Sequence, residues 1–413
     1  MPMPRSELIA LFMAGVRAAD PDAAVRAALA DSAPRPDPGG RLLVVAMGKA
    51  ARGMARAALD MLGTAPAEVL VITNAENAAP LEGARVMVAG HPVPDDAGLR
   101  AGAAVLTLLD GARAGDVVLA LISGGASALV PAPVAGLSLA DKAAVTGAML
   151  GAGMDISAMN AVRQQLSALK GGGFLRAAAP ARVEALILSD VIGDDLRTIA
   201  SGPTAAALTT RAGAAELLRA AGVWEGVPRV VHAALARAED DAPLPQAENR
   251  LIGSNRLSLA AMAEAAAGAR IVSDALTGDV AEAAARIVAT AAAHPAGTPL
   301  LALWGGETTV RLHGTGRGGR NQELALRVAL AMPEGRGWRF LSGGTDGRDG
   351  PTEAAGGVVD AFTAARIDAA GGDAAALLAN NDSHRALALA GDLLVTGGTG
   401  TNVADLQILS LDP

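Results

Sequence analysis

The chain has 413 residues, a formal net charge of −8 at pH 7 and no cysteine. Without cysteine it can form no disulfide framework, thiolate nucleophile or cysteine-ligated zinc site, and the cytoplasm is the expected location. The negative charge and the lack of a concentrated Lys/Arg block argue against sequence-independent binding to nucleic acid or to an anionic membrane surface. At this length we expect two domains rather than one.

The apolar stretches do not indicate a membrane protein. Residues 1–25 lack the long apolar region and the small-residue cleavage site of a signal peptide, so export is not expected. The longest uncharged stretch, residues 117–140, is interrupted by glycines and prolines. These interruptions favour a buried strand, a turn and a loop over a membrane span, and no membrane partner is predicted.

The first half of the chain repeats a unit of strand, turn and helix. An opening helix is predicted over residues 6–29, and apolar runs that read as strands then follow at 41–47, 69–73, 116–122 and 183–188. Strands that alternate with helices at this spacing favour an α/β fold with a doubly wound, mostly parallel, Rossmann-like sheet. Ligands of such sheets bind beyond the carboxyl ends of the strands.

The second half begins after an Ala-rich helical region and an acidic, proline-containing break at residues 238–250. Further strands are predicted at residues 250–253, 270–273, 299–304, 338–342 and 392–396. We therefore expect an N-terminal α/β domain over residues 1–235 and a smaller C-terminal α/β domain over residues 245–413.

Lys49 is the first candidate for the functional site. It follows the predicted strand 41–47 and Gly48, at the start of an Ala/Arg-rich helix. The free N–H groups of a helix start and a lysine ammonium together favour an anion. A solvated lysine at a helix start is the alternative, because the glycine spacing fits neither a Walker A loop nor a dinucleotide fingerprint.

Two further loops of the first half carry polar groups. His91 lies in the Gly90–Asp96 turn and could act as a base, a ligand or a hydrogen-bond donor, or could only cap a neighbouring backbone group. After the strand 116–122, the run from Ser123 through Gly124 and Gly125 to Ser127 combines two hydroxyls with a backbone that an oxyanion can approach closely. We predict a ligand loop there rather than a structural turn.

Charged residues near positions 160–204 extend this candidate site. Arg163 and Lys170 are spaced to share one helix face, which is either solvated or turned towards a cleft. Asp190 and Asp194 follow the apolar strand 183–188 and could hold magnesium, and Asp190 could accept a hydroxyl proton. Helix capping is the alternative role of these carboxylates.

The second half contains a basic, glycine-rich loop and two further glycine-rich strand ends. In the loop at residues 314–324, Arg317, Arg320 and Asn321 are candidates for a phosphate clamp. The strand end at 341–351 and the run at 396–402 repeat the glycine-rich pattern of the first half. The first of them supplies Gly343, Gly344 and Thr345 as phosphate-binding candidates and Asp346 as a metal-ligand candidate. Together, the loops of both halves favour a polyanionic ligand.

The ordered set of motifs resembles the class II glycerate kinases, whose C-terminal half is a MOFRL-type domain. The resemblance covers nearly the whole chain and is carried by AMGKA, GHPVPD, ISGGASA, LSDVIGDD, SGPT, GRNQE, SGGTDGRDGP and TGGTGTN. It implies ATP, a divalent cation, D-glycerate as the acceptor, 2-phosphoglycerate as the product and a site in a cleft between the domains. It also implies catalytic roles for Lys49 and Arg320. The chain departs from the family in carrying Gln164 and Gln165 where relatives often have a basic residue or His.

From these residues we expect an enzyme that transfers phosphoryl from ATP to glycerate. Lys49 and Arg320 would neutralise the transferring group, and Mg²⁺ would be held by some of Asp190, Asp194 and Asp346. An NAD(P)H-dependent hydroxypyruvate reductase is one alternative, although no GxGxxG opens a helix after a strand. A non-catalytic sugar-phosphate-binding module is the other. The sequence leaves open whether the protein forms a homodimer.

Overall fold

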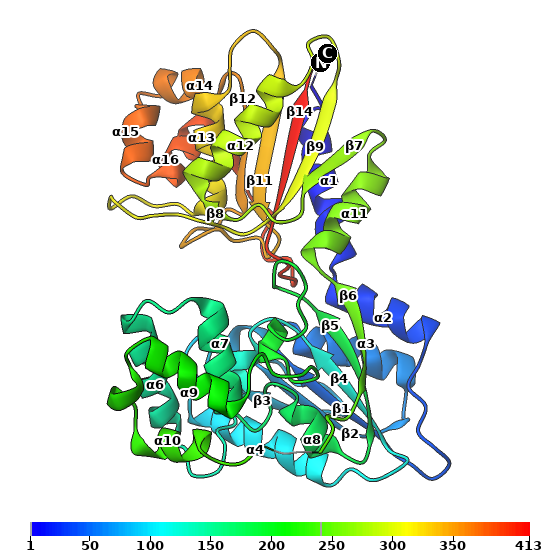
Figure 1. Ribbon diagram of the computed structural model, residues 1–413. Helices are drawn as coiled ribbons and strands as arrows, with labels where there is room; N and C mark the ends of the chain where they lie inside the picture. The colour runs from blue at the N-terminus through cyan, green and yellow to red at the C-terminus, as the bar shows by residue number, and fades with distance from the viewer. Residues whose placement is uncertain (1, 240–241) are drawn as a thin grey trace. The chain divides into compact units, whose positions relative to one another are not determined.

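The computed structural model describes residues 2–239 and 242–413, and their contacts divide the chain into two units (Figure 1). The first, here called the N-terminal unit, comprises residues 21–189 and 194–252. The second, the C-terminal unit, comprises the chain up to Asp20, residues 190–193 and residues 253–413. The boundary expected between residues 235 and 245 includes residues 240 and 241, which lie outside the described part of the chain.

The N-terminal unit is built on a six-stranded sheet in the order β3-β2-β1-β4-β5-β6. Its strands are β1 (Leu42–Met47), β2 (Pro66–Thr73), β3 (Arg85–Val88), β4 (Val117–Ile122), β5 (Arg182–Leu188) and β6 (Ala247–Gly253). The pairs from β3 to β5 are all parallel, which confirms the predicted doubly wound sheet. The strand that we expected at residues 250–253 in the second domain is instead the edge strand β6 of this sheet.

Helices cover this sheet and form a separate helical region. The helices of the unit are α2 (Pro21–Asp31), α3 (Ala51–Leu62), α4 (Asp96–Asp110), α5 (Ala126–Leu129), α6 (Leu139–Gly151), α7 (Ile156–Gln165), α8 (Gly173–Ala178), α9 (Arg211–Ala220) and α10 (Arg229–Leu235). Small residues of α3, such as Ala55 and Ala58, pack on β1, β2 and β4. Helices α6, α7, α9 and α10 pack around their own apolar cluster.

The C-terminal unit contains a mixed six-stranded sheet in the order β13-β12-β11-β14-β9-β7. These strands are β7 (Ala269–Ser273), β9 (Leu300–Gly306), β11 (Trp338–Gly344), β12 (Gly356–Asp360), β13 (Leu393–Leu394) and β14 (Asp405–Leu411), and a small pair is formed by β8 (Gly278–Asp279) and β10 (Thr308–Thr309). Strand β14 pairs antiparallel with both β11 and β9, and so the last strand of the chain lies inside the sheet. Only β7 and β9 pair in parallel among the described strands of this sheet.

Two layers of helices bury both faces of this sheet (Figure 1). The helices of the unit are α1 (Arg5–Ala18), α11 (Asn255–Ala265), α12 (Val280–Ala293), α13 (Arg320–Ala331), α14 (Thr363–Ala369), α15 (Ala374–Ala379) and α16 (Ser383–Ala390). Leu406 and Ile408 of β14 face α1 and α11, whereas Leu409 and Leu411 face α12 and α13. Because both faces of β14 are buried, its apolar residues point to both sides of the sheet.

The opening segment is two helices rather than the single helix expected over residues 6–29. Pro21 begins the second helix, and a proline at that position disfavours a helical conformation in the residue before it. Helix α1 packs in the C-terminal unit: Phe12 is fully buried there, and a Cβ on Gly15 would lie 2.7 Å from Sδ of Met262 in α11. The segment before Asp20 therefore groups with the chain's second half.

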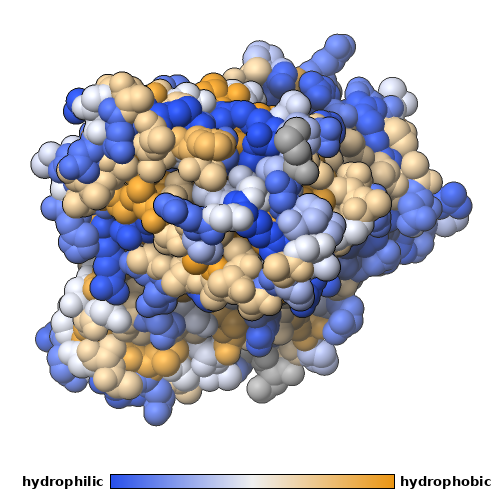
Figure 2. Space-filling model, turned by 90° about the horizontal axis from the view of Figure 1, so that it is seen from above, coloured by the Kyte–Doolittle hydropathy of each residue, from blue (hydrophilic) through white to orange (hydrophobic). Residues whose placement is uncertain are grey.

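None of the helices in the described residues is long and apolar enough to cross a membrane. Figure 2 shows hydrophilic residues over much of the face that it draws, with apolar residues between them in small groups.

Candidate functional site

The turn after β1 holds Lys49 against the loop after β4. Gly48 has φ +126°, and a Cβ at this position would lie 2.2 Å from Oγ of Ser123, so only glycine fits. The backbone N–H of Lys49 donates to the carbonyl of Gly124 at 2.9 Å. The carboxyl ends of two neighbouring strands are thus joined through their loops, as a parallel sheet favours.

His91 lies beside the same loop. A Cβ on Gly125, whose φ is +85°, would lie 3.2 Å from both His91 Nε2 and Lys49 Cγ, which places the three residues together. Burial lowers the pKa of His91, and the positive charge of Lys49 lowers it further. The imidazole therefore stays neutral over most of the physiological range, and Lys49 supplies the positive charge at these strand ends.

Ser123 has a local partner for its hydroxyl. The side chain is buried, and its Oγ accepts a hydrogen bond of 3.1 Å from the backbone N–H of Ala50, directly before α3. This contact satisfies one of the free donors at the helix start. Among the predicted ligand residues of this loop, Ser123 therefore orients the Lys49 turn, and Ser127 lies in the short helix α5.

Ser127 takes part in a buried chain of polar contacts. Lys170 donates to Ser127 Oγ at 2.7 Å, and the hydroxyls of Ser127 and Ser201 lie 3.0 Å apart. The prediction that Arg163 and Lys170 share one helix face is wrong, because α7 ends at Gln165 and Lys170 lies in the turns that follow. The structure nevertheless brings Lys170 into the loop region of β4.

The acidic run after β5 does not stay together. Asp190 is counted with the C-terminal unit, and Asp194 with the N-terminal unit, where it has φ +55°. Asp195 accepts from the backbone N–H of Arg197 at 2.9 Å and forms an ion pair with its guanidinium. This local pairing accounts for the carboxylate of Asp195, the neighbour of Asp194.

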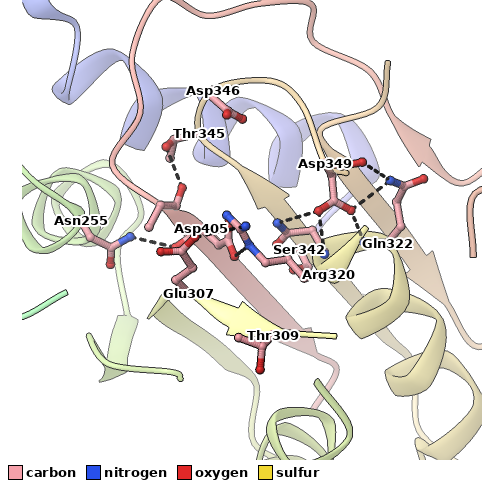
Figure 3. A network of polar contacts seen from close by, with 12 residues as sticks. Asn255, Glu307, Thr309, Arg320, Gln322, Ser342, Thr345, Asp346, Asp349 and Asp405 are labelled. Atoms are coloured by element: carbon pink, nitrogen blue, oxygen red, sulfur yellow. Dashed lines mark hydrogen bonds and ion pairs between the residues drawn. The ribbon is translucent and has the colours of Figure 1, made fainter. Parts of the chain in front are cut away.

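In the C-terminal unit, Arg320 is the first residue of α13 and is held by two carboxylates (Figure 3). Its Nε and Nη2 donate to the two oxygens of Asp405 at 2.7 and 2.9 Å, and its Nη1 lies 3.2 Å from Glu307. Burial raises the pKa of Asp405 to about 6, although Arg320 acts to lower it. Burial acts to lower the pKa of Arg320, but Asp405 and Glu307 raise it, so the guanidinium stays charged.

Asp349 fixes the start of the same helix. Its carboxylate accepts from the backbone N–H groups of Asn321 and Gln322 at 3.1 and 2.8 Å, which satisfies two free donors of α13. A Cβ on Gly319 would lie 2.3 Å from Asp349 Cγ, so this approach requires glycine. Burial raises the pKa of Asp349. The glycines before Arg320 thus allow a buried carboxylate to cap the helix.

Arg320 lines a cavity of about 560 Å³. Glu307, Thr309, Gly319 and Asp349 also line it. A volume of this order is typical of small-molecule sites. The larger cavity, of about 780 Å³, belongs to the N-terminal unit and is lined by Gln164, Lys170, Arg176 and Arg211 among others.

The other phosphate-binding candidates of this unit are engaged within the protein. Arg317 is half-exposed and pairs with Glu353 at 3.0 Å. Asn321 is fully buried and accepts from Ser342 Oγ at 2.6 Å. Thr345 donates to the carbonyl of Ala404 at 2.7 Å, which ties the loop after β11 to the segment before β14.

The glycines after β11 allow close packing on both sides. A Cβ on Gly343 would lie 2.9 Å from the Phe12 ring of α1. On Gly344 it would lie 3.3 Å from Oδ1 of Asp346 and 3.6 Å from Oδ1 of Asp405. Among the residues that the structure describes, no three His, Asp or Glu side chains form a group that could hold a metal ion. Asp346 is the predicted metal ligand that lies, with Asp405, beside Gly344.

Comparisons with known proteins agree with this architecture. The sequence profile described as Domain of unknown function (DUF4147) matches residues 7–236, and that of the MOFRL family matches residues 300–405. D-glycerate 2-kinase of Thermotoga maritima is 40% identical over 383 residues, which cover 89% of this chain and 90% of that protein. The chain belongs to the glycerate kinase family.

Solved structures and a differently named relative complete the comparison. The crystal structure of glycerate kinase from Thermotoga maritima matches with a TM-score of 0.91 at 38% identity, covering 99% of this chain and 100% of that one. A protein of Agrobacterium vitis called putative hydroxypyruvate reductase is 38% identical over 419 residues, 98% of this chain and 94% of that one. The family thus carries two functional names.

Several residues around the candidate sites were missed by sequence reasoning. Asp405 and Glu307, which hold Arg320, are far from it in the sequence and reach it through the pairing of β14 with β9. Lys142 was not considered, although it acts electrostatically on Lys170. The sequence did contain one signal for these missed residues, because Asp405 is an acidic residue directly at the start of an apolar strand.

Proposed function

We propose that this protein transfers the terminal phosphoryl group of ATP to the 2-hydroxyl of D-glycerate, which gives 2-phosphoglycerate and ADP. The observation that carries the proposal is the match of nearly the whole chain, at 40% identity, to a protein called D-glycerate 2-kinase. Phosphoryl transfer needs positioning and positive charge more than covalent chemistry. The glycine-lined cationic sites, Lys49 at a strand end and Arg320 at a helix start, are consistent with that need.

The proposed roles of the residues follow from their chemistry. Arg320, which two carboxylates hold in one orientation, would supply positive charge to the transferring phosphoryl, and Lys49 would supply more. The backbone of Gly124 and Gly125, together with Ser127, would bind glycerate or phosphate, with Arg163 and His91 as further contacts. Asp190 is the proposed acceptor of the hydroxyl proton.

Mg²⁺ is the metal that we propose for the ATP phosphates. Magnesium commonly keeps several waters and uses one or two protein carboxylates beside the phosphates, so it does not need a dedicated three-ligand cage. Asp346, partly buried next to Gly344, is a suitable oxygen donor, and Asp190 and Asp194 are the other candidates. The bound ion would neutralise charge on the ATP phosphates during the transfer.

One set of parallel assays tests the function against its alternatives. The purified protein is incubated with ATP, Mg²⁺ and D-glycerate, and separately with hydroxypyruvate and NADH or NADPH. We expect ADP release in the first reaction and no loss of reduced nicotinamide in the second. Nicotinamide oxidation without ADP release would favour the reductase, and glycerate or phosphate binding without turnover would favour a binding module.

We also propose a cytoplasmic location and leave the homodimer as the assembly to be tested. The lack of cysteine suits a reducing compartment. Light scattering coupled to size-exclusion chromatography distinguishes a 40.8 kDa monomer from a dimer.

A further inference from the structure

Three cationic side chains of the N-terminal unit act on one another, and none of them has an acidic partner among the residues that the structure describes. Lys170 is 8% exposed, and the charges that act on it come from Lys142 and Arg163. Burial lowers the pKa of Lys170 well below its usual value, and these two positive charges lower it further. Burying several like charges together is costly, so the cluster favours an anion, and no acidic side chain in the described part of the chain supplies one.

Each of these side chains has few contacts inside the protein. Lys170 donates to Ser127, and Lys142 donates to the carbonyl of Pro131 at 2.8 Å. Burial lowers the pKa of Lys142 to about 7, and Arg163 contributes to the shift. Burial alone lowers the pKa of Arg163, and no carboxylate or hydrogen-bond acceptor among the described residues offsets it. The guanidinium of Arg163 thus keeps its planar set of donors for a ligand.

The Ser201 loop beside Lys170 has an unusual backbone. Ala200 and Ser201 have φ values of +52° and +64°, a left-handed conformation that residues other than glycine rarely adopt. Gly171 N–H and the side-chain amide of Gln164 both donate to the Ser201 carbonyl, at 3.0 and 3.1 Å. Backbone strain of this kind persists where the surroundings enforce it, and here it directs the Ser201 hydroxyl to Ser127.

We propose that Lys170, together with Arg163 and Lys142, binds the carboxylate of the acceptor acid. The inference rests on the proposed function and names the subsite that would select an acid over a neutral polyol. A 2-hydroxy acid carries its carboxylate next to a hydroxyl. The cations would bind the carboxylate, and the nearby hydroxyls of Ser127 and Ser201 would bind the ligand hydroxyl. A phosphate group of the nucleotide would satisfy the same cations, and the experiment separates the two sources.

The test compares Lys170→Met with wild type and with Arg85→Gln, which removes an exposed positive charge on β3 of the same unit. Loss of a charge-assisted contact should raise KM for D-glycerate roughly 10- to 100-fold and leave KM for ATP within about twofold. Arg85→Gln should leave both values unchanged. A rise in KM for ATP instead would assign the cluster to the nucleotide, and unchanged KM values for both substrates would overturn the inference.

Calorimetry adds a measurement that a structural role would not affect. An anion at the cluster raises the pKa values of Lys170 and Lys142, so D-glycerate binding by wild type should take up protons near neutral pH. The uptake is measured in two buffers of different ionisation enthalpy. Lys170→Met and Arg163→Met should both reduce it, and equal uptake in all three proteins would contradict the proposal. Arg163→Met keeps the test valid if Lys170→Met does not fold.

The same titrations separate this inference from the proposed function. If wild type binds D-glycerate at the cluster but gives no ADP, the function fails and the carboxylate site stands. If wild type phosphorylates D-glycerate while Lys170→Met and Arg163→Met keep its KM, the site fails and the function stands. Inorganic phosphate that binds in place of D-glycerate, with the same dependence on Lys170, would also overturn the carboxylate assignment.

Discussion

In the C-terminal unit, Arg320 donates two hydrogen bonds to the buried Asp405 and faces Glu307, whereas in the N-terminal unit Lys170 has one serine hydroxyl and two other cations around it. The first charge is compensated before any ligand arrives, and its orientation is set by protein groups. No carboxylate of residues 2–239 or 242–413 compensates the second charge. The difference shows two ways to prepare a positive charge for an anion. Protein carboxylates can hold the cation in one orientation at little cost, or the cation can be left unpaired, which lowers the stability of the fold.

The largest expected effect is on catalysis by Arg320. Replacement of Arg320 by Ala should lower turnover on the order of 10³-fold or more, because phosphoryl transfer depends on charge stabilisation of the transferring group. Initial rates with ATP and D-glycerate measure it, and circular dichroism checks the fold. The matched control is Arg327→Gln on the same helix, where Arg327 pairs with Glu323 at 2.8 Å. Turnover by Arg320→Ala near the wild-type rate would remove Arg320 from the mechanism.

Asp405→Asn tests the compensated side of the comparison. It breaks the two-point contact of a fully buried carboxylate with Arg320, and we expect the free energy of unfolding to fall by about 2 kcal/mol. Urea unfolding measures the change. Glu307→Gln is the control, since Glu307 is 48% exposed and its pair should contribute less than about 1 kcal/mol. Equal losses of unfolding free energy in the two variants would show that the burial of Asp405 does not strengthen its contact with Arg320.

Lys170→Met tests the uncompensated side and should change stability in the opposite direction. Removing a buried, unpaired charge should raise the free energy of unfolding by about 1 kcal/mol or more. Unfolded Lys170 binds its proton more tightly than folded Lys170 does, so the free energy of unfolding of wild type rises with pH towards 10.5. The stability gained by Lys170→Met should therefore shrink over that range. Urea unfolding at several pH values measures both effects. A destabilised Lys170→Met would mean that Lys170 supports the fold.

The smallest expected effect concerns the Lys49 turn. Burial is the main cause of the lowered His91 pKa, and Lys49 adds to it, so Lys49→Met should raise the pKa of His91 towards its usual value. Titration of the imidazole signals by NMR measures the shift, with His91→Gln to assign the resonance. His294, which belongs to the C-terminal unit, serves as an internal reference. An unmoved His91 signal would show that Lys49 does not act on the imidazole.

Sequence reasoning worked best where an interaction is local. The apolar runs predicted β1, β4 and β5 almost to the residue, because buried parallel strands are continuously hydrophobic. The glycine signals at 48 and 125 also marked real close approaches between strand ends. Each of these features depends on a few adjacent residues.

Long-range pairing decided what could not be predicted. The position of β14 between β11 and β9 brings Asp405 to Arg320, and nothing in the local pattern gives that register. Helix α1 joins the C-terminal unit through contacts of Phe12 and Gly15 with residues hundreds of positions away. The cationic cluster likewise depends on the turns after α7. We did not predict these turns, because we assumed that one helix continued through them.

The position of the transferred phosphoryl group tests the central claim most directly. Wild-type protein is incubated with ATP, Mg²⁺ and D-glycerate, and the product is identified by phosphorus-coupled ¹³C NMR. We predict 2-phosphoglycerate, with the phosphorus coupling on the carbon that bears the 2-hydroxyl. A coupling at the terminal carbon would assign a 3-kinase, and unphosphorylated glycerate after prolonged incubation with folded protein would contradict the account.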